Sequence, residues 1–448
     1  MRIIICGAGE VGRHVAEVLA TADHDVTVID KDGSRLRAVE EVIDVRTLEG
    51  NCADAGTLLE ADVKGADMVI ASTSNDEVNL LCASLAKGLG AIKTVARVHR
   101  AMYFEHRRAS YQQIFNIDRL ICPEYSTAIA IAQTLRNPAA LAIENFARNQ
   151  IEVQQFPVSD NADALSRPLS QIKLPLGTRL AAIGREGKFY IPTAKSTVEK
   201  GDSVILVGNT NHFEVARRFF HDQKTGRRKV VIMGGPPMAA WLCRSLRNRN
   251  ISIRLFETNA ERAKELAAEL DWVTVINADP TDRLTFDEEH IGEADAFVAL
   301  VHDEENILGC VLAKTTGVKQ AIAVVERANY LHLLERVGID RPFSPRMVAA
   351  KEIERMLDES DLRRMASLAE GEIEVFRVRV NPAAPTIGKA LKEIQLSPHW
   401  ILAAVQRGET VRVPNADEII QPEDILLLIG KAGEEKTLRQ LFKVTSAP

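Results

Sequence analysis

A glycine-rich loop near the N-terminus has the residue types and spacing that hold a phosphate group. The loop is Gly7-Ala8-Gly9-Glu10-Val11-Gly12, and it follows a short apolar run over residues 2–6. In such a loop the first glycine permits a tight turn, the second lets the backbone approach a pyrophosphate, and the third lets the next helix pack closely. Free amides and the helix dipole then favour an anion. The loop predicts a nucleotide site.

An acidic residue follows the second predicted strand, where ribose recognition would need it. Asp30 lies 18 residues after Gly12, and Lys31 follows it. A carboxylate in this place accepts hydrogen bonds from ribose hydroxyls and disfavours a 2′-phosphate. We therefore expect NAD(H) or an adenosine nucleotide such as ATP or ADP in this loop, with Asp30 at an exposed edge of the sheet. An empty structural loop is the alternative.

Two polar loops follow predicted strands at the same edge. Asn51 and Cys52 come after the third strand, and the fourth is followed by Ser72-Thr73-Ser74-Asn75-Asp76-Glu77. Ligands of such sheets bind at the carboxyl ends of the strands, so both loops are included in the predicted site. Ser74 and Glu77 also fit a capping box for the next helix. The stretch therefore predicts helix capping, ligand contact, or both.

The remaining polar candidates do not make an enzyme's set. Arg97, in the fifth predicted strand, is either an inward-pointing phosphate partner or a paired surface arginine. His99 and His106 fall in an Arg-rich stretch, and we expect them to be solvated rather than catalytic. A dehydrogenase needs a proton donor, and an ATPase needs a Walker-type lysine with a magnesium-binding hydroxyl. We predict no catalytic residue and no metal site; an NAD-dependent oxidoreductase acting on a small substrate is the alternative.

The elements that position these residues alternate between strand and helix. Apolar runs predict strands over 2–6, 25–30, 45–48, 68–72 and 94–98, with helices between them. This alternation indicates an α/β fold with a doubly wound, Rossmann-like parallel sheet. A longer helix is predicted from Pro123 to about residue 135, where a crossover helix would lie. Glycine-separated runs then predict a β-rich lobe, with strands over 151–158, 179–183, 188–191 and 203–207 and a helix over 212–220.

The same plan occurs a second time. Gly7, Asp30 and Asp76 match residues 227 positions later, and Arg185 and Asp202 match residues 222 positions later: Gly234, Glu257, Asp303, Arg407 and Asp424. We therefore predict two tandem Rossmann domains, each followed by a small β-rich α+β lobe. The predicted boundaries are 1–137, 138–222, 228–358 and 359–448. A helix over 358–370 is the predicted connection within the second pair.

The second glycine loop departs from the first. It contains Gly234-Gly235-Pro236-Pro237, so a proline takes the place of Gly9. Proline removes a backbone donor and puts ring bulk where the pyrophosphate would lie, although Pro237 is compatible with the first turn of a helix. Glu257 keeps the acidic position. We predict that the second Rossmann lobe is structural and does not bind a nucleotide.

Composition excludes several classes of protein. The chain has 448 residues and a net charge of −6 without a long block of one sign, which argues against a nucleic-acid partner. It has neither an apolar run long enough to span a membrane nor a cleavable signal pattern, so we expect no membrane span and no secretion. The cysteines are scattered without metal-ligand spacing, and we expect them to be reduced, mostly buried thiols: Cys6, Cys52, Cys82, Cys122, Cys243 and Cys310.

Across its whole length the chain resembles the TrkA family, the regulatory subunits of Trk potassium uptake that contain two RCK domains. The resemblance rests on the order of the lobes, their duplication and a few motifs: the glycine loop, Asp30-Lys31-Asp32, Thr73 with Asp76-Glu77-x-Asn79, and Ile183-x-Arg185-x-Gly187 followed by Gly201-Asp202. It implies nucleotide contacts at Gly7 to Val11, Asp30, Thr73, Ser74 and Arg97. The chain departs at Pro236-Pro237, where the family often keeps a third glycine.

The resemblance also implies a function and partners. It implies a cytoplasmic ring, usually a homotetramer, that is peripheral on the inner face of the cell membrane. The ring would dock on an integral-membrane potassium-transporting subunit of the TrkH or TrkG type. NAD(H) or ATP and ADP would gate transport, and the chain itself would not be an enzyme.

Overall fold

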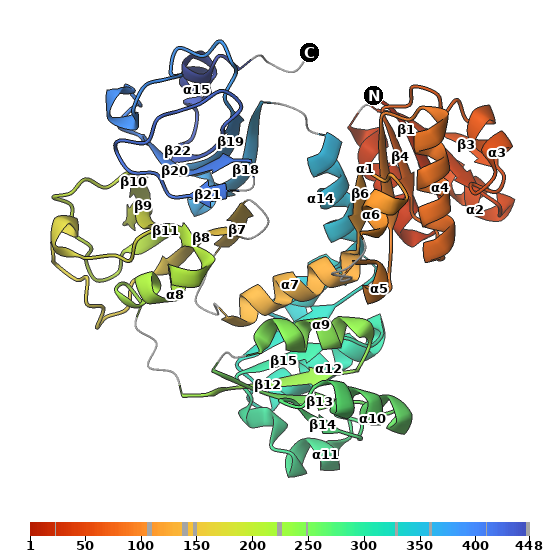
Figure 1. Ribbon diagram of the computed structural model, residues 1–448. Helices are drawn as coiled ribbons and strands as arrows, with labels where there is room; N and C mark the ends of the chain where they lie inside the picture. Colours follow the sequence, from red (N-terminus) through yellow and green to blue (C-terminus); the bar gives the residue numbers. More distant parts are fainter. Residues whose placement is uncertain are drawn as a thin grey trace. The chain divides into compact units, whose positions relative to one another are not determined.

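The computed structural model describes residues 1–22, 24–104, 110–136, 142–146, 150–221, 226–247, 250–327, 330–357, 361–408 and 410–444. The chain forms two compact units, each made of two separate segments (Figure 1). The first unit comprises Met1–Arg136 and Gly226–Leu357, and the second comprises Asn137–Thr225 and Asp358–Pro448. Each is described by itself below. The predicted domain boundaries at 137/138, 222 and 358/359 fall outside the described residues, as does His106.

The first lobe of the first unit is built on a six-stranded parallel sheet. Its strand order is β3-β2-β1-β4-β5-β6. The strands are β1 (Arg2–Cys6), β2 (Asp25–Asp30), β3 (Arg46–Glu49), β4 (Met68–Ala71), β5 (Lys93–Arg97) and β6 (Arg119–Ile121). The order reverses between β1 and β4, which opens a crevice at the carboxyl ends of these strands. The five predicted strands are confirmed, and β6 is additional.

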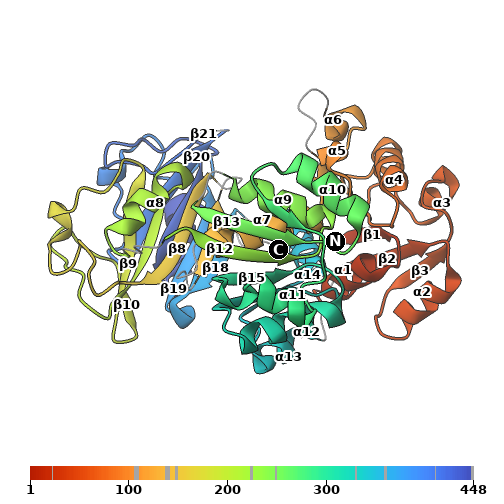
Figure 2. The same ribbon diagram turned by 90° about the horizontal axis from the view of Figure 1, so that it is seen from below.

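Helices cover both faces of this sheet (Figures 1 and 2). They are α1 (Glu10–Thr21), α2 (Gly33–Glu40), α3 (Ala55–Glu60) and α4 (Asp76–Leu89), followed by the short α5 (Ala101–Phe104) and α6 (Tyr111–Ile114). Ile3 and Ile5 of β1 share a core with α1 and α2, whereas Ile4 and Cys6 share one with α3 and α4. Burial on both faces explains why β1 is a continuous apolar run.

The second lobe of this unit repeats the first. Its sheet order is β14-β13-β12-β15-β16-β17, with every neighbouring pair parallel. The strands are β12 (Arg228–Met233), β13 (Ile251–Phe256), β14 (Thr274–Ile276), β15 (Ala296–Ala299), β16 (Gln320–Val324) and β17 (Arg341–Phe343). The helices are α9 (Pro237–Leu246), α10 (Ala260–Glu269), α11 (Arg283–Glu288), α12 (Asp303–Thr315) and α13 (Leu331–Leu334). The predicted duplication of the Rossmann lobe is confirmed.

The two lobes exchange their last helices. Helix α7 (Pro123–Arg136) follows the first sheet but packs on α9 of the second lobe, where the rings of Tyr125 and Trp241 meet edge to face at 5.6 Å. Helix α14 (Pro345–Leu357) follows the second sheet but packs on α1, and its Ile353 enters the core of the first lobe. The predicted crossover helix is therefore confirmed, and the exchange is reciprocal.

The second unit contains two antiparallel five-stranded sheets of the same plan. Their orders are β10-β9-β11-β8-β7 and β18-β19-β22-β20-β21. The first set is β7 (Ala142–Phe146), β8 (Ile151–Pro157), β9 (Thr178–Arg185), β10 (Lys188–Tyr190) and β11 (Ser203–Asn209), with α8 (Thr210–Arg218). The second set is β18 (Leu362–Leu368), β19 (Ile373–Arg379), β20 (Trp400–Arg407), β21 (Thr410–Arg412) and β22 (Ile425–Lys431), with α15 (Glu435–Phe442). The predicted β-rich lobes are confirmed.

The helix predicted over 358–370 is wrong. Residues 358–360 lie outside the described part of the chain, and Leu362–Leu368 is a strand that pairs antiparallel with β19. Leu362 and Leu368 are buried at its two ends, whereas most residues between them are only partly buried. The mixed charges of this segment suit an exposed helix, but pairing with a neighbouring strand overrides that local preference.

A buried ion pair recurs in both β-rich lobes. The Asp202 carboxylate accepts two hydrogen bonds from Arg185, at 2.9 and 2.8 Å, and a third from the backbone amide of Glu199. Asp424 and Arg407 repeat the bidentate pair, with both distances 2.8 Å. The Asp202 carboxylate raises the pKa of Arg185 and keeps it charged. The recurring arginine and aspartate therefore hold the turn before each central strand.

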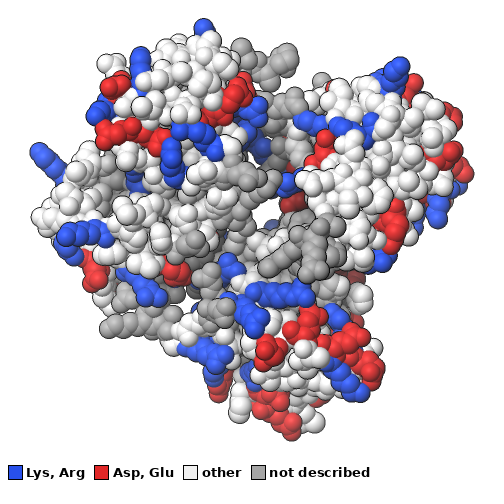
Figure 3. Space-filling view, in the orientation of Figure 1, with Lys and Arg blue, Asp and Glu red and all other residues white. Residues whose placement is uncertain are grey.

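Charged side chains are interspersed over the surface. Figure 3 shows basic and acidic residues mixed on the face in view, in keeping with the modest net charge of −6. Among the described helices, none is both long enough and apolar enough to cross a membrane.

The helix exchange predicts where a core mutation acts. Ile353 is fully buried in the core of the first lobe although it follows the second sheet in sequence. We expect Ile353→Ala to lower the free energy of unfolding of the first lobe by about 2–5 kcal/mol and to speed amide exchange in β1 and α1. Met347→Ala is the control, because Met347 lies on the same helix but is 48% exposed. Faster exchange confined to the second sheet would contradict the exchanged packing.

Candidate functional site

A pocket of about 680 Å³ lies at the carboxyl edge of the first sheet. That volume is within the usual range of small-molecule sites. It is lined by residues of all the loops singled out in the sequence: Gly7, Gly9, Glu10, Val11, Asp30, Lys31, Asn51, Cys52, Ser72, Thr73, Ser74, Asn75 and Arg97. Ala8, Gly12 and Glu77 are not among its lining residues. The structure thus brings most of the predicted residues together, while nucleotide contact by each stays a prediction.

The three glycines of the loop have different reasons to be glycine. Gly7 has a positive φ of 108°, and a Cβ there would lie 2.9 Å from the backbone nitrogen of Thr73. A Cβ at Gly12 would lie 1.9 Å from the Gly7 carbonyl oxygen. A Cβ at Gly9 would meet no atom within 4 Å, and Gly9 has an ordinary extended backbone just before α1. The fold requires Gly7 and Gly12, whereas Gly9 leaves open space beside the pocket.

Asp30 holds the glycine loop in place. Its carboxylate accepts hydrogen bonds from the backbone amides of Ala8, at 2.6 Å, and Asp32, at 3.0 Å. Asp30 is only 8% exposed, so the expectation of an exposed sheet edge is wrong; contact with the loop buries the side chain. In the second lobe Glu257 accepts from Gly235 in the same way, at 2.8 Å. The acidic residue therefore has a structural role in both lobes, besides any contact with ribose.

The helix after β4 is capped differently from the prediction. Asn75 is the N-cap, and its side-chain oxygen accepts from the amide of Val78 at 2.8 Å, so the capping box of Ser74 and Glu77 is wrong. Because Asn75 already satisfies this amide, Glu77 is free to bond elsewhere. It accepts hydrogen bonds from Arg100, at 2.5 Å, and from Tyr103, at 2.8 Å. These bonds hold Glu77 away from the pocket.

Asp76 and His99 form a close pair at the pocket wall. The Asp76 carboxylate contacts His99 Nδ1 at 2.7 Å and accepts from the backbone amides of His99 and Arg100. The His99 side chain is 35% exposed and lines the pocket, so it is not simply solvated as predicted. Asp303 caps the matching segment of the second lobe, where a glutamate, Glu326, replaces the histidine. The aspartate therefore serves the fold in both lobes.

Arg97 is an inward-lying, ion-paired residue. Its guanidinium lies 2.6 Å from a carboxylate oxygen of Glu124 at the start of α7, and its side chain is only 13% exposed. Its Nε is buried and has no hydrogen-bond partner among the described residues. Of the two alternatives, the paired surface arginine is excluded by this burial. A phosphate near Arg97 would share the guanidinium with Glu124.

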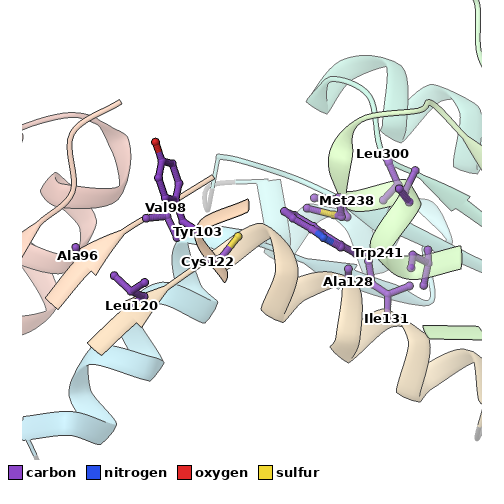
Figure 4. Close-up of a cluster of buried hydrophobic side chains, with 14 of the residues drawn as sticks. Ala96, Val98, Tyr103, Leu120, Cys122, Ala128, Ile131, Met238, Trp241 and Leu300 are labelled. Carbon is purple, nitrogen blue, oxygen red and sulfur yellow. The ribbon is translucent and has the colours of Figure 1, made fainter. Parts of the chain in front are cut away.

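The other wall of the pocket comes from the second lobe. It is formed by residues that follow that lobe's own strands and by the start of α14: Pro236, Pro237, Met238, Trp241, Leu300, Val301, Asp303, Val324, Glu326, Pro345 and Arg346. Met238 and Trp241 of α9 lie against Ala128 and Ile131 of the exchanged helix α7 (Figure 4). No local motif marks these residues as part of a site, because the fold alone brings them to the first glycine loop.

An ion pair joins the two walls. Arg346, at the start of α14, lies 2.5 Å from the carboxylate of Glu10, the first residue of α1. The Arg346 side chain is 14% exposed, whereas that of Glu10 is 72% exposed. The guanidinium therefore sits beside the start of α1, where the phosphates of a nucleotide would lie. The sequence alone did not suggest Arg346.

The six cysteines are all buried, and three of them lie together. The sulfur atoms of Cys6, Cys52 and Cys82 are all within 4.8 Å of one another, so the prediction of scattered thiols is wrong for these three. The other two thiols can donate hydrogen bonds to Cys52, which lowers its pKa. The remaining cysteines lie singly, and burial raises the pKa of each to about 12: Cys122, Cys243 and Cys310.

Two family models match the chain, and each matches twice. The TrkA-N domain model matches residues 3–123 and 230–345, and the TrkA-C domain model matches residues 153–221 and 375–443. The Trk system potassium uptake protein TrkA homolog of Archaeoglobus fulgidus is 35% identical over 99% of this chain and 100% of its own length. The Trk system potassium uptake protein TrkA of Vibrio alginolyticus is 29% identical over 96% of both chains.

Solved structures show the same fold. The GsuK RCK domain has a TM-score of 0.62 at 17% identity, covering 99% of this chain and 95% of that one. The GsuK channel bound to NAD has a TM-score of 0.62 at 18% identity, covering 99% and 79% of the two chains. With two TrkA-N and two TrkA-C domains in alternation, and a full-length relative at 35% identity, the chain belongs to the TrkA family.

Proposed function

We propose that the chain is a nucleotide-sensing regulatory subunit of a membrane potassium uptake system, binding NAD(H) or ATP and ADP in the first Rossmann lobe. The observation that carries the proposal is the open space at Gly9, beside the start of α1. A glycine that the fold does not require, in a loop of this type, leaves room for a pyrophosphate. The names of the relatives and the NAD-bound GsuK channel support the same conclusion.

The pocket offers a route from binding to gating. Its two walls belong to different lobes, and the Glu10–Arg346 ion pair links the first turns of α1 and α14. A phosphate group at the start of α1 would compete with Glu10 for the Arg346 guanidinium. Nucleotides that differ in phosphate or nicotinamide charge would then favour different arrangements of the lobes, with a coupling of about 1–3 kcal/mol. The second lobe would be the fixed partner against which the first lobe moves.

We propose the following setting for this subunit. The chain would assemble as a homotetrameric ring in the cytoplasm, peripheral on the inner face of the cell membrane. Its partner would be an integral-membrane potassium-transporting subunit of the TrkH or TrkG type, and nucleic acid would not be a partner. The four predicted domains would keep the boundaries given by the sequence, with the second Rossmann lobe free of nucleotide because of Pro236 and Pro237.

One observation favours a second candidate, an NAD-dependent oxidoreductase. His99 and Asp76 form a pair that could transfer a proton at the pocket wall. The bonds of Asp76 to the backbone recur at Asp303 in the second lobe, where there is no histidine, so they do not require catalysis. Incubation with NADH distinguishes the candidates: binding without oxidation over hours supports sensing, and substrate-dependent oxidation that His99→Gln abolishes supports an enzyme.

The open space at Gly9 predicts one nucleotide per chain. We expect calorimetry with NADH, and separately with ATP, to find a single site, and Gly9→Val to weaken binding by about a hundredfold or more, which is about 2.8 kcal/mol. The valine meets no atom of the protein and blocks only the ligand. Gly226→Val is the control, because a Cβ at Gly226 also meets no atom within 4 Å and Gly226 does not line the pocket. Two equivalent sites per chain would contradict the proposal.

The two roles of Asp30 can be separated. We expect Asp30→Ala to weaken nucleotide binding by about 1–3 kcal/mol, because a charged hydrogen-bond partner is lost. Glu257→Ala is the matched control, since Glu257 holds the second loop through the same kind of bond. It should lower thermal stability to a similar degree and leave the affinity measured by calorimetry unchanged. Equal loss of affinity in both variants would make Asp30 a fold residue only.

Gating predicts a difference between nucleotides. We expect ATP and ADP, or NADH and NAD, to give distinct solution-scattering curves and opposite effects on potassium flux through a reconstituted transporter. Arg346→Gln should reduce these differences, because it removes the charge at the start of α14 that a phosphate can recruit. Scattering and flux that are identical for the ligand-free protein and each saturated complex would leave the nucleotide without a switching role.

A further inference from the structure

Three thiols converge at the floor of the first-lobe pocket from three different elements. Cys6 is the last residue of β1, Cys52 lies in the loop between β3 and α3, and Cys82 lies in α4. Their sulfur atoms are all within 4.8 Å of one another, and all three residues are buried. We propose that these three cysteines bind a soft, thiophilic metal ion, of which Cu(I) and Zn(II) are the candidates.

The spacing of the sulfur atoms fits one shared ion. A zinc–sulfur bond is about 2.3 Å long, so three thiolates around one ion lie about 4 Å apart. The sulfur atoms therefore need only small side-chain movements to enclose an ion. Cys6 and Cys82 are fully buried, so the core holds these two ligands in place.

The chemistry of the ligands selects the ion. Thiolates favour Cu(I) and Zn(II), whereas Mg²⁺ and Ca²⁺ require oxygen ligands. Each thiol that binds the ion releases one proton, so no oxidant or reductant is needed. Cys52 also lines the pocket, which gives the ion a path of entry and leaves one coordination position facing the pocket. This site does not depend on the proposed nucleotide function.

The second lobe shows that the fold does not need these thiols. Met233 lies 227 residues after Cys6, and Gly309 lies 227 residues after Cys82. A Cβ at Gly309 would lie 2.9 Å from the Met233 sulfur, so that one methionine side chain fills the space between sheet and helix. The loop over 277–281 has no cysteine. A single thioether thus packs the same contact in which the first lobe gathers three thiols, and packing alone does not account for them.

The test uses the full chain, reduced and freed of metal. Zn(II), and in a separate anaerobic experiment Cu(I), is equilibrated with the protein by dialysis, and bound metal is measured by elemental analysis. We expect one ion per chain for at least one of the two metals, and at least tenfold weaker binding after Cys52→Ala or Cys82→Ala. Cys310→Ala is the control, because Cys310 is a buried cysteine on the matching helix of the second lobe.

A second measurement guards against misfolded variants. X-ray absorption by the metal in the unmutated protein should show a first shell dominated by three sulfur atoms. The proposal is overturned if neither ion binds, if the shell contains mainly nitrogen or oxygen, or if Cys310→Ala loses the ion as completely as Cys52→Ala does. A disulfide between two of the three cysteines in the reduced preparation, detected by mass, would overturn it as well.

Discussion

The reciprocal exchange of helices α7 and α14 is the constraint on which the first unit depends. Each helix follows one sheet and packs on the first helix of the other lobe. Ser126 of α7 also bonds to Glu352 of α14 at 2.6 Å, so the two exchanged helices contact each other. Because apolar side chains such as Ile353 and Trp241 are buried by this exchange, neither lobe can complete its core alone. The pocket inherits its two walls from the same arrangement.

The duplication separates residues that serve the fold from residues that are free to serve a ligand. Contacts present in both lobes, such as the bond between the second-strand acid and the glycine loop, belong to the architecture. Positions that differ are more informative. Gly9 faces open space where the second lobe has Pro236, and Cys6 meets two other thiols where the second lobe has Met233. An internal repeat thus acts as a control within one molecule.

The sequence was sufficient for features that depend on local patterns. The glycine loop, the alternation of strands and helices and the duplication were predicted, because periodicity and turn residues encode them directly. The helix assigned over 358–370 failed because pairing with β19 decides the state of Leu362–Leu368. Arg346 and the cluster at Cys6 were missed for a related reason: chain segments distant in sequence create them, and no spacing rule connects such segments.

The helix exchange also bears on how such a chain could have arisen. A polypeptide with a single Rossmann lobe would expose the face of α1 that α14 covers here, together with the face of α7 that covers α9. Two such copies could satisfy each other by the same exchange, as a symmetric dimer with two equal crevices. Joining the copies in one chain removes the need for symmetry, since each half then always meets the other. One half can therefore lose its glycine loop while the partnership of the helices is kept.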